Sequence, residues 1–369
     1  METKLLNGNN KEAIAEASKI LQDGGLVAFP TETVYGLGAD ALNADAAAKI
    51  YAAKGRPSDN PLIVHIADTD AVEKLADLET MNRTHPDMVK KAYMLMEAFW
   101  PGPLTIIFPK LAIVPDGTTG GLPTVAIRMP SHPIAQELIR TSGVSIAAPS
   151  ANTSGRPSPT TAQHVWEDMD GRIEMILDGG AVGIGIESTI VDMTGTIPTI
   201  LRPGFITKTM LSEIVGDVTI DPAIIEPDPN LRPKAPGMKY THYAPHGTLS
   251  IVEAVADESA NRASLHSGVK VSYNATEAET LRVAEKIKAL VNEKEAQGYK
   301  VAILTTKEHA SLYKNYSHVL IVGEGSKGQT ISARLYAALR ECDSEQMEYM
   351  YSEAFDQNEL GGAIMNRLL

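Results

Sequence analysis

Short apolar runs, joined by connections that are often too brief for a crossover helix, constrain the fold of this chain more than any other feature. The runs that have the length and composition of buried strands are LVAFP, PLIVHI, LTIIFP, TVAIRM, VSIAAP, IEMILD, STIVDM and TILRP. Helical patterns lie among them, such as residues 10–23 and the ADAAAKIYAAK stretch after Asn43, which ends at Gly55. Parallel strands need connections of a dozen residues or more, so we expect an α/β fold whose sheet is mixed.

A change in composition and periodicity divides the chain into two regions. Residues 221–245, DPAIIEPDPNLRPKAPGMKYTHYAP, carry a proline every few positions and show no periodicity, which is typical of an extended connector. The strand patterns LSIVEAV, VKVSYN, YKVAILTT and HVLIVG follow, and they alternate with helical stretches. We therefore predict a first domain over residues 1–215, a proline-rich connector over 216–247 and a smaller Rossmann-like α/β domain over 248–369.

Charge and cysteine content exclude several functional classes. The 46 acidic residues outnumber the 33 basic ones, giving a formal charge of -13, so a large nucleic-acid footprint is not expected. Cys342 is the single cysteine, which rules out an internal disulfide and a thiol cluster for zinc. No apolar run approaches twenty residues and the N-terminus lacks a signal-peptide pattern. These features predict a cytoplasmic protein without a membrane segment.

The stretch KGRPSDNPLIVHI allows two interpretations. Lys54 followed by Gly55 is typical of a helix end. Arg56 lies beyond that end and is held extended by Pro57, so its guanidinium is placed to bind phosphate oxygens. His65 lies inside an apolar strand, where histidine is usually a core residue.

Two loop segments carry most of the remaining polar chemistry. In PTETVYGLG, Thr31, Glu32 and Thr33 either satisfy a turn or line the floor of a ligand pocket. The GLGADA that starts at Gly36 is a weak dinucleotide signal, because TETVY intervenes after the strand. In PSANTSGRPSPTTAQHV, hydroxyls and backbone amides between a strand and a helix near Thr160 can bind an anion. No Ser-His-Asp spacing and no metal-ligand cluster emerges.

Several ordered motifs together resemble one known family. FPTETVYGLG, KGRPSDNPLIVHI, AIRMP, APSANTSGRPSPTTAQHV, ESTIVD and LRPG resemble the YrdC-like domain of the threonylcarbamoyl-AMP synthases. PGMKYTHYAP and the C-terminal LGGAIMNRLL look like the longer, two-domain form of that family. The resemblance implies a twisted mixed α/β sheet around a central cavity, followed by the Rossmann-like domain. One departure is Thr241, where the family pattern leads us to expect a basic residue.

The resemblance also implies the site residues. The catalytic Lys-x-Arg and Ser-x-Asn pairs fall on Lys54, Arg56, Ser150 and Asn152. The threonine-binding positions fall on Thr33, His65, Arg128, Ala148 and Ser188. The ATP-binding positions fall on Arg56, Asn60, Thr124, Ser150, Ser158 and Arg202. The connector residues that we expect to form a lid over the nucleotide are Lys239, Tyr240, His242 and Tyr243.

The implied reaction joins L-threonine, bicarbonate or CO2, and ATP into threonylcarbamoyl-AMP with release of pyrophosphate. Mg²⁺ is expected to accompany ATP, held by phosphates and water rather than by a protein metal site. Downstream partners are the proteins that transfer the threonylcarbamoyl group to tRNA. Two alternatives remain. One is a double-stranded RNA-binding module without catalysis, for which even weak contact with RNA would be evidence. The other is a nicotinamide oxidoreductase that uses GLGADA.

Overall fold

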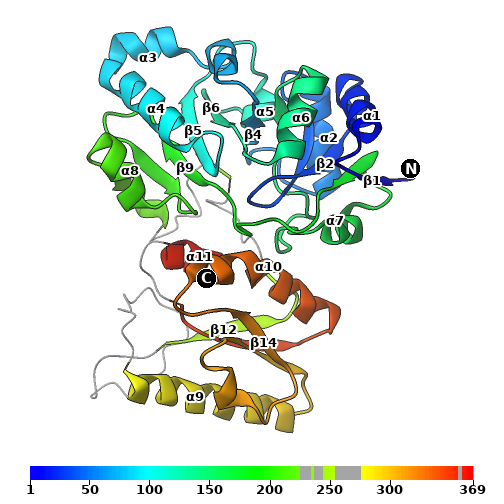
Figure 1. The fold of residues 1–369 in the computed structure, drawn as a ribbon, viewed down its shortest axis with the longest axis vertical. Coiled ribbons are helices and arrows are strands. Elements are labelled where there is room, and N and C mark those ends of the chain that lie inside the picture. Colours follow the sequence, from blue (N-terminus) through cyan, green and yellow to red (C-terminus); the bar gives the residue numbers. More distant parts are fainter. Residues whose placement is uncertain (225–233, 237–243, 254–275, 356–359, 369) are drawn as a thin grey trace. The chain divides into compact units, whose positions relative to one another are not determined.

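The computed structural model describes residues 1–224, 234–236, 244–253, 276–355 and 360–368. It divides into two compact units, Met1–Thr241 and His242–Leu369 (Figure 1). Part of the predicted connector belongs to the first unit, because β11 (Thr219–Ile220) pairs in parallel with β10 (Thr199–Arg202). No helix in the described part of the chain is long and apolar enough to cross a membrane.

The first unit is built on an eleven-stranded sheet in the order β1-β8-β2-β3-β7-β4-β6-β5-β9-β10-β11. Its remaining strands are β1 Lys4–Asn7, β2 Val27–Pro30, β3 Tyr35–Asp40, β4 Ile63–His65, β5 Leu104–Pro109, β6 Thr124–Arg128, β7 Ile146–Ala147, β8 Met175–Asp178 and β9 Thr189–Asp192. Among the described strands, five neighbouring pairs are parallel and five are antiparallel. The predicted mixed sheet is confirmed.

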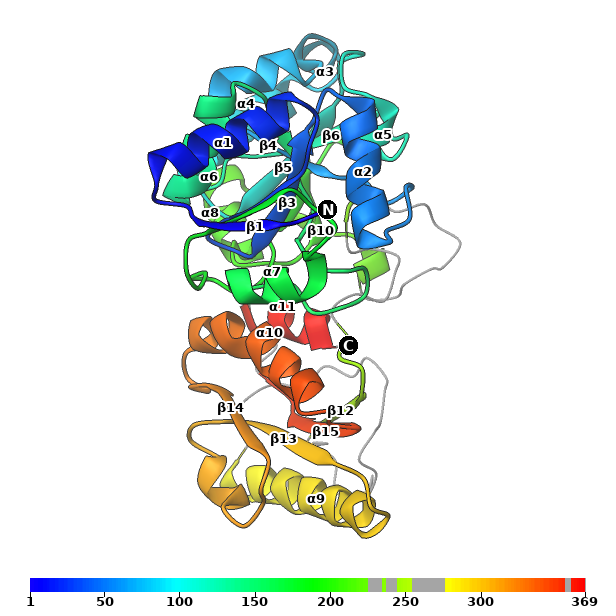
Figure 2. The ribbon, with the colours of Figure 1, turned by 90° about the vertical axis from the view of Figure 1, so that its right-hand side faces the viewer.

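Helices cover both faces of this sheet, as Figure 2 shows for α1 and α6 on one face and α2 on the other. The helices are α1 Lys11–Gln22, α2 Ala44–Lys54, α3 Leu78–Thr84, α4 Pro86–Phe99, α5 Asp116–Thr119, α6 Pro133–Ser142, α7 Ala162–Met169 and α8 Lys208–Val215, with 3-10 turns η1 Thr69–Lys74 and η2 Pro222–Ile224. Alternation along β2 explains the two layers. Val27 and Phe29 pack with α1 and α6, whereas Ala28 belongs to the core on the other face.

The second unit is a smaller sheet in the order β12-β15-β13-β14, and its described strands all pair in parallel. Its elements are β12 Thr248–Val252, α9 Glu277–Ala296, β13 Val301–Thr306, η3 Ala310–Tyr313, β14 Val319–Gly323, α10 Gly328–Ser344, β15 Tyr349–Glu353 and α11 Leu360–Leu368. This doubly wound architecture agrees with the predicted Rossmann-like domain. The strand predicted at VKVSYN lies outside the described residues.

The dinucleotide interpretation of GLGADA is wrong. Gly36 to Asp40 lie inside β3, paired antiparallel with β2, and not at a strand-to-helix turn. Gly38 is required for packing, since a Cβ there would come within 2.6 Å of Ile146 and 2.8 Å of Phe29. The glycines therefore serve the contact between β3 and its neighbours.

Candidate active site

Lys54 lies at the end of α2, whose limits are set by local chemistry. The Asn43 side chain accepts hydrogen bonds from the backbone at the helix start, and Gly55 ends the helix in the left-handed conformation with φ of 63°. The Lys54 side chain is buried and its ammonium donates to Ser150 O at 2.5 Å and to Asn152 O. The end of α2 is thereby joined to a loop 96 residues further along the chain.

The Ser150–Asn152 pair forms the other side of this contact. Ser150 Oγ donates to Asn152 Oδ1 at 2.5 Å, and Lys54 Nζ lies 3.4 Å from the same oxygen. Backbone hydrogen bonds tie this loop to β3, from Ala151 N to Tyr35 O at 2.8 Å and from Leu37 N to Pro149 O at 2.9 Å. The two loop segments predicted to carry polar chemistry therefore lie together, and three of the four predicted catalytic residues are in direct contact.

Arg56 lies just beyond this contact. Its guanidinium donates to Asn60 O at 3.4 Å and to Pro61 O at 3.1 Å. Asn60 is 1% exposed, and within the described part of the chain neither its Oδ1 nor its Nδ2 has a hydrogen-bond partner. A buried amide without partners costs free energy, so this position is prepared for a ligand that supplies both an acceptor and a donor.

The predicted threonine-binding residues come from neighbouring strands. His65 in β4 and Arg128 in β6 are register partners, and Arg128 Nη1 donates to Thr33 Oγ1 at 2.9 Å. Arg128 also forms an ion pair with Glu32 at 2.7 Å. Ala148 joins the group through the backbone, since its N donates to Ile63 O at 2.8 Å. Four of the five predicted positions thus lie at adjacent strands of the sheet.

His65 is neutral at physiological pH. It is buried, its ring meets Phe29 edge-on with ring centres 6.1 Å apart, and Nδ1 lies 3.1 Å from Ile63 O. Burial, together with the positive charge of Arg128, lowers the pKa of His65 to about 3. Whether this ring contacts threonine stays a prediction.

Ser188, the fifth threonine position, meets the predicted ATP site through Arg202. Arg202 donates from Nη2 to Ser188 Oγ at 3.1 Å and from Nε to Ser188 O at 3.1 Å. Ser158 donates to Glu187 Oε1 at 2.6 Å, which places another predicted ATP residue beside Ser188. Thr124 begins β6 and lies four residues before Arg128, about 13 Å along the strand, so it belongs to a different part of the sheet.

Part of the connector packs on this sheet. Ala235 is fully buried in an apolar cluster whose other members come from strands β4, β5, β6, β9 and β10. The cluster members are Ile63, Ile107, Ala126, Ile190, Leu201 and Ala235. Arg202 Nη1 also lies 3.4 Å from Pro236 O. The predicted lid residues Lys239, Tyr240, His242 and Tyr243 lie outside the described residues.

Three polar side chains make contacts at the site that were not predicted, although one of them, Glu32, lies in the segment expected to line the floor of a ligand pocket. Glu32 pairs with Arg128, Glu187 accepts from Ser158, and Thr105 Oγ1 lies 2.8 Å from Ser188 Oγ. Each carries a signal in the sequence, because Glu32 and Glu187 lie within the motifs and Thr105 is a hydroxyl within an apolar strand. These signals indicate buried polar contacts but do not identify the partner.

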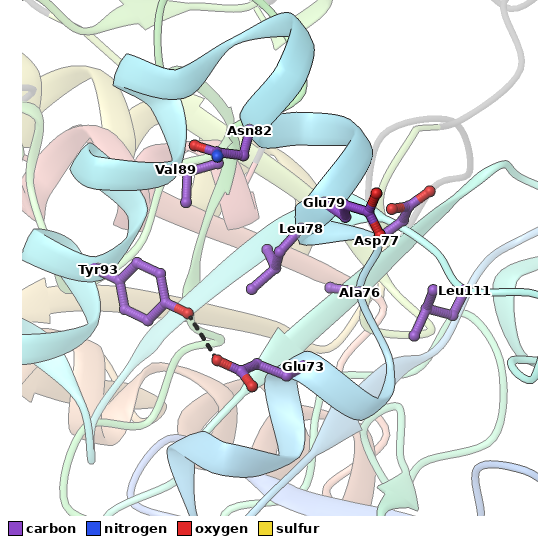
Figure 3. Close-up of a pocket in the computed structure, with 9 residues that line it drawn as sticks. All are labelled: Glu73, Ala76, Asp77, Leu78, Glu79, Asn82, Val89, Tyr93 and Leu111. Atoms are coloured by element: carbon purple, nitrogen blue, oxygen red, sulfur yellow. Dashed lines mark hydrogen bonds between the residues drawn. The ribbon is translucent and has the colours of Figure 1, made fainter.

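A surface hollow of about 540 Å³ lies elsewhere on the first unit, between η1, α3 and α4 (Figure 3). It is lined by Glu73, Ala76, Asp77, Leu78, Glu79, Asn82, Val89, Tyr93 and Leu111. The Tyr93 hydroxyl donates to Glu73 at 3.3 Å. The lining contains three carboxylates, those of Glu73, Asp77 and Glu79, and no basic side chain. Such a lining repels phosphates, so the hollow is not the predicted nucleotide site.

The protein is of the α/β class: its first unit brings cationic, hydroxyl and amide side chains together, and its second unit is Rossmann-like. Residues 19–204 match the family described as telomere recombination, and residues 206–369 match the family described as threonylcarbamoyl-AMP synthase, C-terminal domain. Together the two matches span nearly the whole chain. The chain belongs to the threonylcarbamoyl-AMP synthase family, in its two-domain form, and is an enzyme.

Individual relatives support this assignment over nearly the full length. The threonylcarbamoyl-AMP synthase of Bacillus subtilis is 45% identical over 361 residues, covering 98% of this chain and 93% of the relative. The Pyrococcus abyssi enzyme of the same name is 40% identical over 365 residues, covering 98% and 95%. The crystal structure of P. abyssi Sua5 complexed with L-threonine superposes with a TM-score of 0.83 at 40% identity, covering 100% of this chain and 96% of that one.

Proposed function

We propose that this chain is an L-threonylcarbamoyladenylate synthase, which converts L-threonine, bicarbonate or CO2, and ATP into threonylcarbamoyl-AMP and pyrophosphate. The observation that carries the proposal is the direct hydrogen bonding between residues of the two predicted substrate sets, Ser188 for threonine and Arg202 for ATP. Two substrates that react with each other need adjoining sites. The family membership favours this catalytic function over an RNA-binding module without catalysis.

The chemistry needs placement more than a protein nucleophile. The threonine amine attacks CO2 to form a carbamate, and a carbamate oxygen then attacks the α-phosphorus of ATP while pyrophosphate leaves. Lys54, Arg56 and Arg202 donate to neutral oxygen atoms, which phosphate oxygens can replace as acceptors. Fixed donors of this kind stabilise the charge that develops on the phosphate without reorganisation.

Arg128 and Thr33 are placed to bind the amino-acid substrate. The Arg128 guanidinium is fixed by Glu32 and Thr33, and it offers the geometry that suits a carboxylate. Burial keeps His65 neutral, so Arg128 is the cation beside these strands that can pair with the carboxylate of the substrate. This arrangement supports the proposal that threonine binds beside Thr33 and Arg128.

Mg²⁺ is proposed to enter with ATP. The described residues include no group of three or more His, Cys, Asp or Glu side chains that could hold a metal ion, so a protein-built magnesium cage does not fit. Phosphate oxygens and water are the usual ligands of this ion, and when bound it neutralises triphosphate charge. We place the reaction in the cytoplasm, where the product would pass to the proteins that transfer the threonylcarbamoyl group to tRNA.

The connector is proposed to act as a lid over the nucleotide. Burial of Ala235 against five strands and the contact from Arg202 to Pro236 support this, because they bring the connector to the ATP residues. Limited proteolysis provides the test. ATP with L-threonine is expected to protect the connector from cleavage, and equal cleavage with and without substrates would show that it is only a tether.

Pyrophosphate release tests the reaction itself. The purified protein is incubated with ATP, L-threonine and bicarbonate, and each substrate is omitted in turn. We expect release only when all three are present. Equal release without L-threonine would overturn the assignment.

A further inference from the structure

Asp168 on α7 is a buried carboxylate that none of the substrate sets includes. Its side chain is 0% exposed. Oδ1 accepts a hydrogen bond from Arg156 Nη1, and Oδ2 accepts one from Thr153 N at 3.0 Å. Both donors belong to the short turn that follows Asn152, so the carboxylate attaches this turn to α7.

The same turn fixes the amide of Asn152. Asn152 Nδ2 donates to Thr153 O at 2.8 Å and to Arg156 O at 2.9 Å. Because the amide nitrogen is held by these two carbonyls, Oδ1 must lie on the opposite side. There it accepts from Ser150 Oγ at 2.5 Å and faces Lys54 Nζ at 3.4 Å. The orientation of the amide thus places the acceptor of the Ser150 hydroxyl beside the Lys54 ammonium, which donates its shorter hydrogen bonds to Ser150 O and Asn152 O.

A continuous set of hydrogen bonds therefore leads from α7 to the predicted catalytic residues. It begins at the Asp168 carboxylate, passes through the turn and the Asn152 amide, and ends at Lys54 and Ser150. A charged acceptor is stronger than a neutral one and holds an arginine and a backbone amide in fixed geometry. Because α7 is packed through Val165 and Met169 in the main core, the Asp168 carboxylate attaches the turn to a helix that is itself fixed.

We propose that Asp168 is a positioning residue for Lys54, Ser150 and Asn152, acting through the turn between Thr153 and Arg156. The expected effect of Asp168 on turnover rests on the proposed function. Its expected effect on ATP affinity can be measured without any turnover. Asp168 contacts no substrate in this scheme; it sets the geometry of residues that do.

The test compares Asp168→Asn with Glu167→Gln, the same change on the exposed neighbour of the same helix. ATP and L-threonine affinities are measured separately by isothermal titration calorimetry. We expect Asp168→Asn to weaken ATP binding about ten-fold, as loss of one charge-assisted contact does, and to leave L-threonine affinity unchanged. Glu167→Gln should match the wild type in both. Unchanged ATP affinity in Asp168→Asn would overturn the proposal, as would an equal loss for both ligands.

A double-mutant cycle separates positioning from general destabilisation. If Asp168 acts through Asn152, the change Asp168→Asn should have little further effect on ATP affinity in an Asn152→Ala background. Additive losses would show that Asp168 acts elsewhere and would overturn the proposal. Should Asp168→Asn fail to fold, Asp168→Glu takes its place in the same cycle, since it keeps the charge but displaces the turn.

Turnover distinguishes this proposal from the function on which it rests. In a wild type that releases pyrophosphate, Asp168→Asn should lower kcat about ten- to a hundred-fold. A kcat equal to that of the wild type would count against positioning. A wild type that binds ATP but releases no pyrophosphate would refute the proposed function alone, and the binding cycle would still decide the role of Asp168.

Discussion

The two units each place a histidine beside a charged partner, and the partners have opposite signs. His65 in the first unit lies in β4 next to Arg128 of β6, and burial with that charge lowers its pKa to about 3. His309 in the second unit has its Nδ1 2.5 Å from Glu353 Oε2, and this hydrogen bond raises its pKa. One histidine is kept neutral and the other is stabilised as a cation.

The two units also differ in how their buried polar groups are hydrogen-bonded. The Glu353 carboxylate accepts hydrogen bonds from Thr305 Oγ1 at 2.8 Å and from Thr306 N at 2.9 Å, besides facing His309. Asn60 in the first unit is also buried, but neither of its amide atoms has a hydrogen-bond partner among the residues that the structure describes. The carboxylate of the second unit is thus satisfied from within the unit, whereas the first unit leaves a buried amide for an incoming ligand. The difference is in keeping with the proposed placement of the substrate residues in the first unit.

Substrate analogues offer the largest expected effect on this comparison. If the buried hydroxyls and Arg128 of the first unit recognise threonine, 2-aminobutyrate, which lacks the hydroxyl, should lose about 10²- to 10⁴-fold in kcat/KM for pyrophosphate release. Serine, which keeps the hydroxyl and lacks a methyl, should be intermediate. Comparable rates with all three amino acids would show that the first unit does not recognise the hydroxyl.

Lys54→Met should have the next largest effect. Removing the ammonium leaves Ser150 O and Asn152 O without their buried donor, so kcat should fall about 10²- to 10³-fold. Lys49→Met is the matched control on the same helix, because Lys49 is exposed and donates only to Gly24 O among its hydrogen bonds described here. Equal losses in both variants would mean that α2 as a whole, and not the Lys54 contact, was disturbed.

Arg56→Ala should cost about ten- to a hundred-fold in turnover, the value of one charge-assisted phosphate contact. Arg56 lies on the loop beyond the end of α2 and donates to the backbone carbonyls of Asn60 at 3.4 Å and Pro61 at 3.1 Å, so thermal unfolding should occur close to the wild-type Tm. Activity and Tm are measured on the same preparation. A large drop in Tm with little kinetic change would instead assign Arg56 to the termination of α2.

The pH dependence of stability tests the contrast between the two histidines most directly. Since the pKa of His65 is lowered on folding, its contribution is full above the unfolded pKa of about 6.5 and is lost toward pH 3, by about 1.4 kcal/mol per pH unit. The raised pKa of His309 has the opposite sign. Its contribution is full below about pH 6.5 and is lost as pH rises through the folded pKa.

Urea unfolding from pH 4 to 8 measures both effects. His65→Gln should flatten the acid side of the stability curve, and His309→Gln should flatten the neutral to alkaline side. Flattening on the same side in both variants would remove the contrast between the two histidines.

Local chemistry is what made parts of the fold predictable from the sequence. Helix α2 could be placed because Asn43 and Gly55 mark its two ends within one short stretch. In contrast, β15 was not predicted, although it lies between β12 and β13, because its five residues include Ser352 and Glu353, whose burial depends on partners elsewhere in the sheet. β1 was missed for a related reason, since its four residues are mostly exposed and pair only with the distant β8.

The site residues divide in the same way, into those that local motifs indicate and those that depend on distant strands. The motifs indicated Lys54, Ser150 and Asn152, and the structure brings them together. The contacts of Glu32 with Arg128 and of Thr105 with Ser188 could not be predicted, because they depend on which strands are neighbours in the mixed sheet. Sequence patterns specify a strand more readily than its neighbour.

The 96-residue separation between Lys54 and Ser150 also bears on how the protein is made. Ribosomes add about 5–20 residues per second, so several seconds pass between synthesis of the end of α2 and synthesis of its partner loop. Arg202 follows after a further delay. During that interval the nascent chain carries Lys54 and Arg56 without the loop that Lys54 contacts in the folded protein. If the proposed ATP site is right, ATP binding in a refolding experiment should appear only after these long-range contacts have formed.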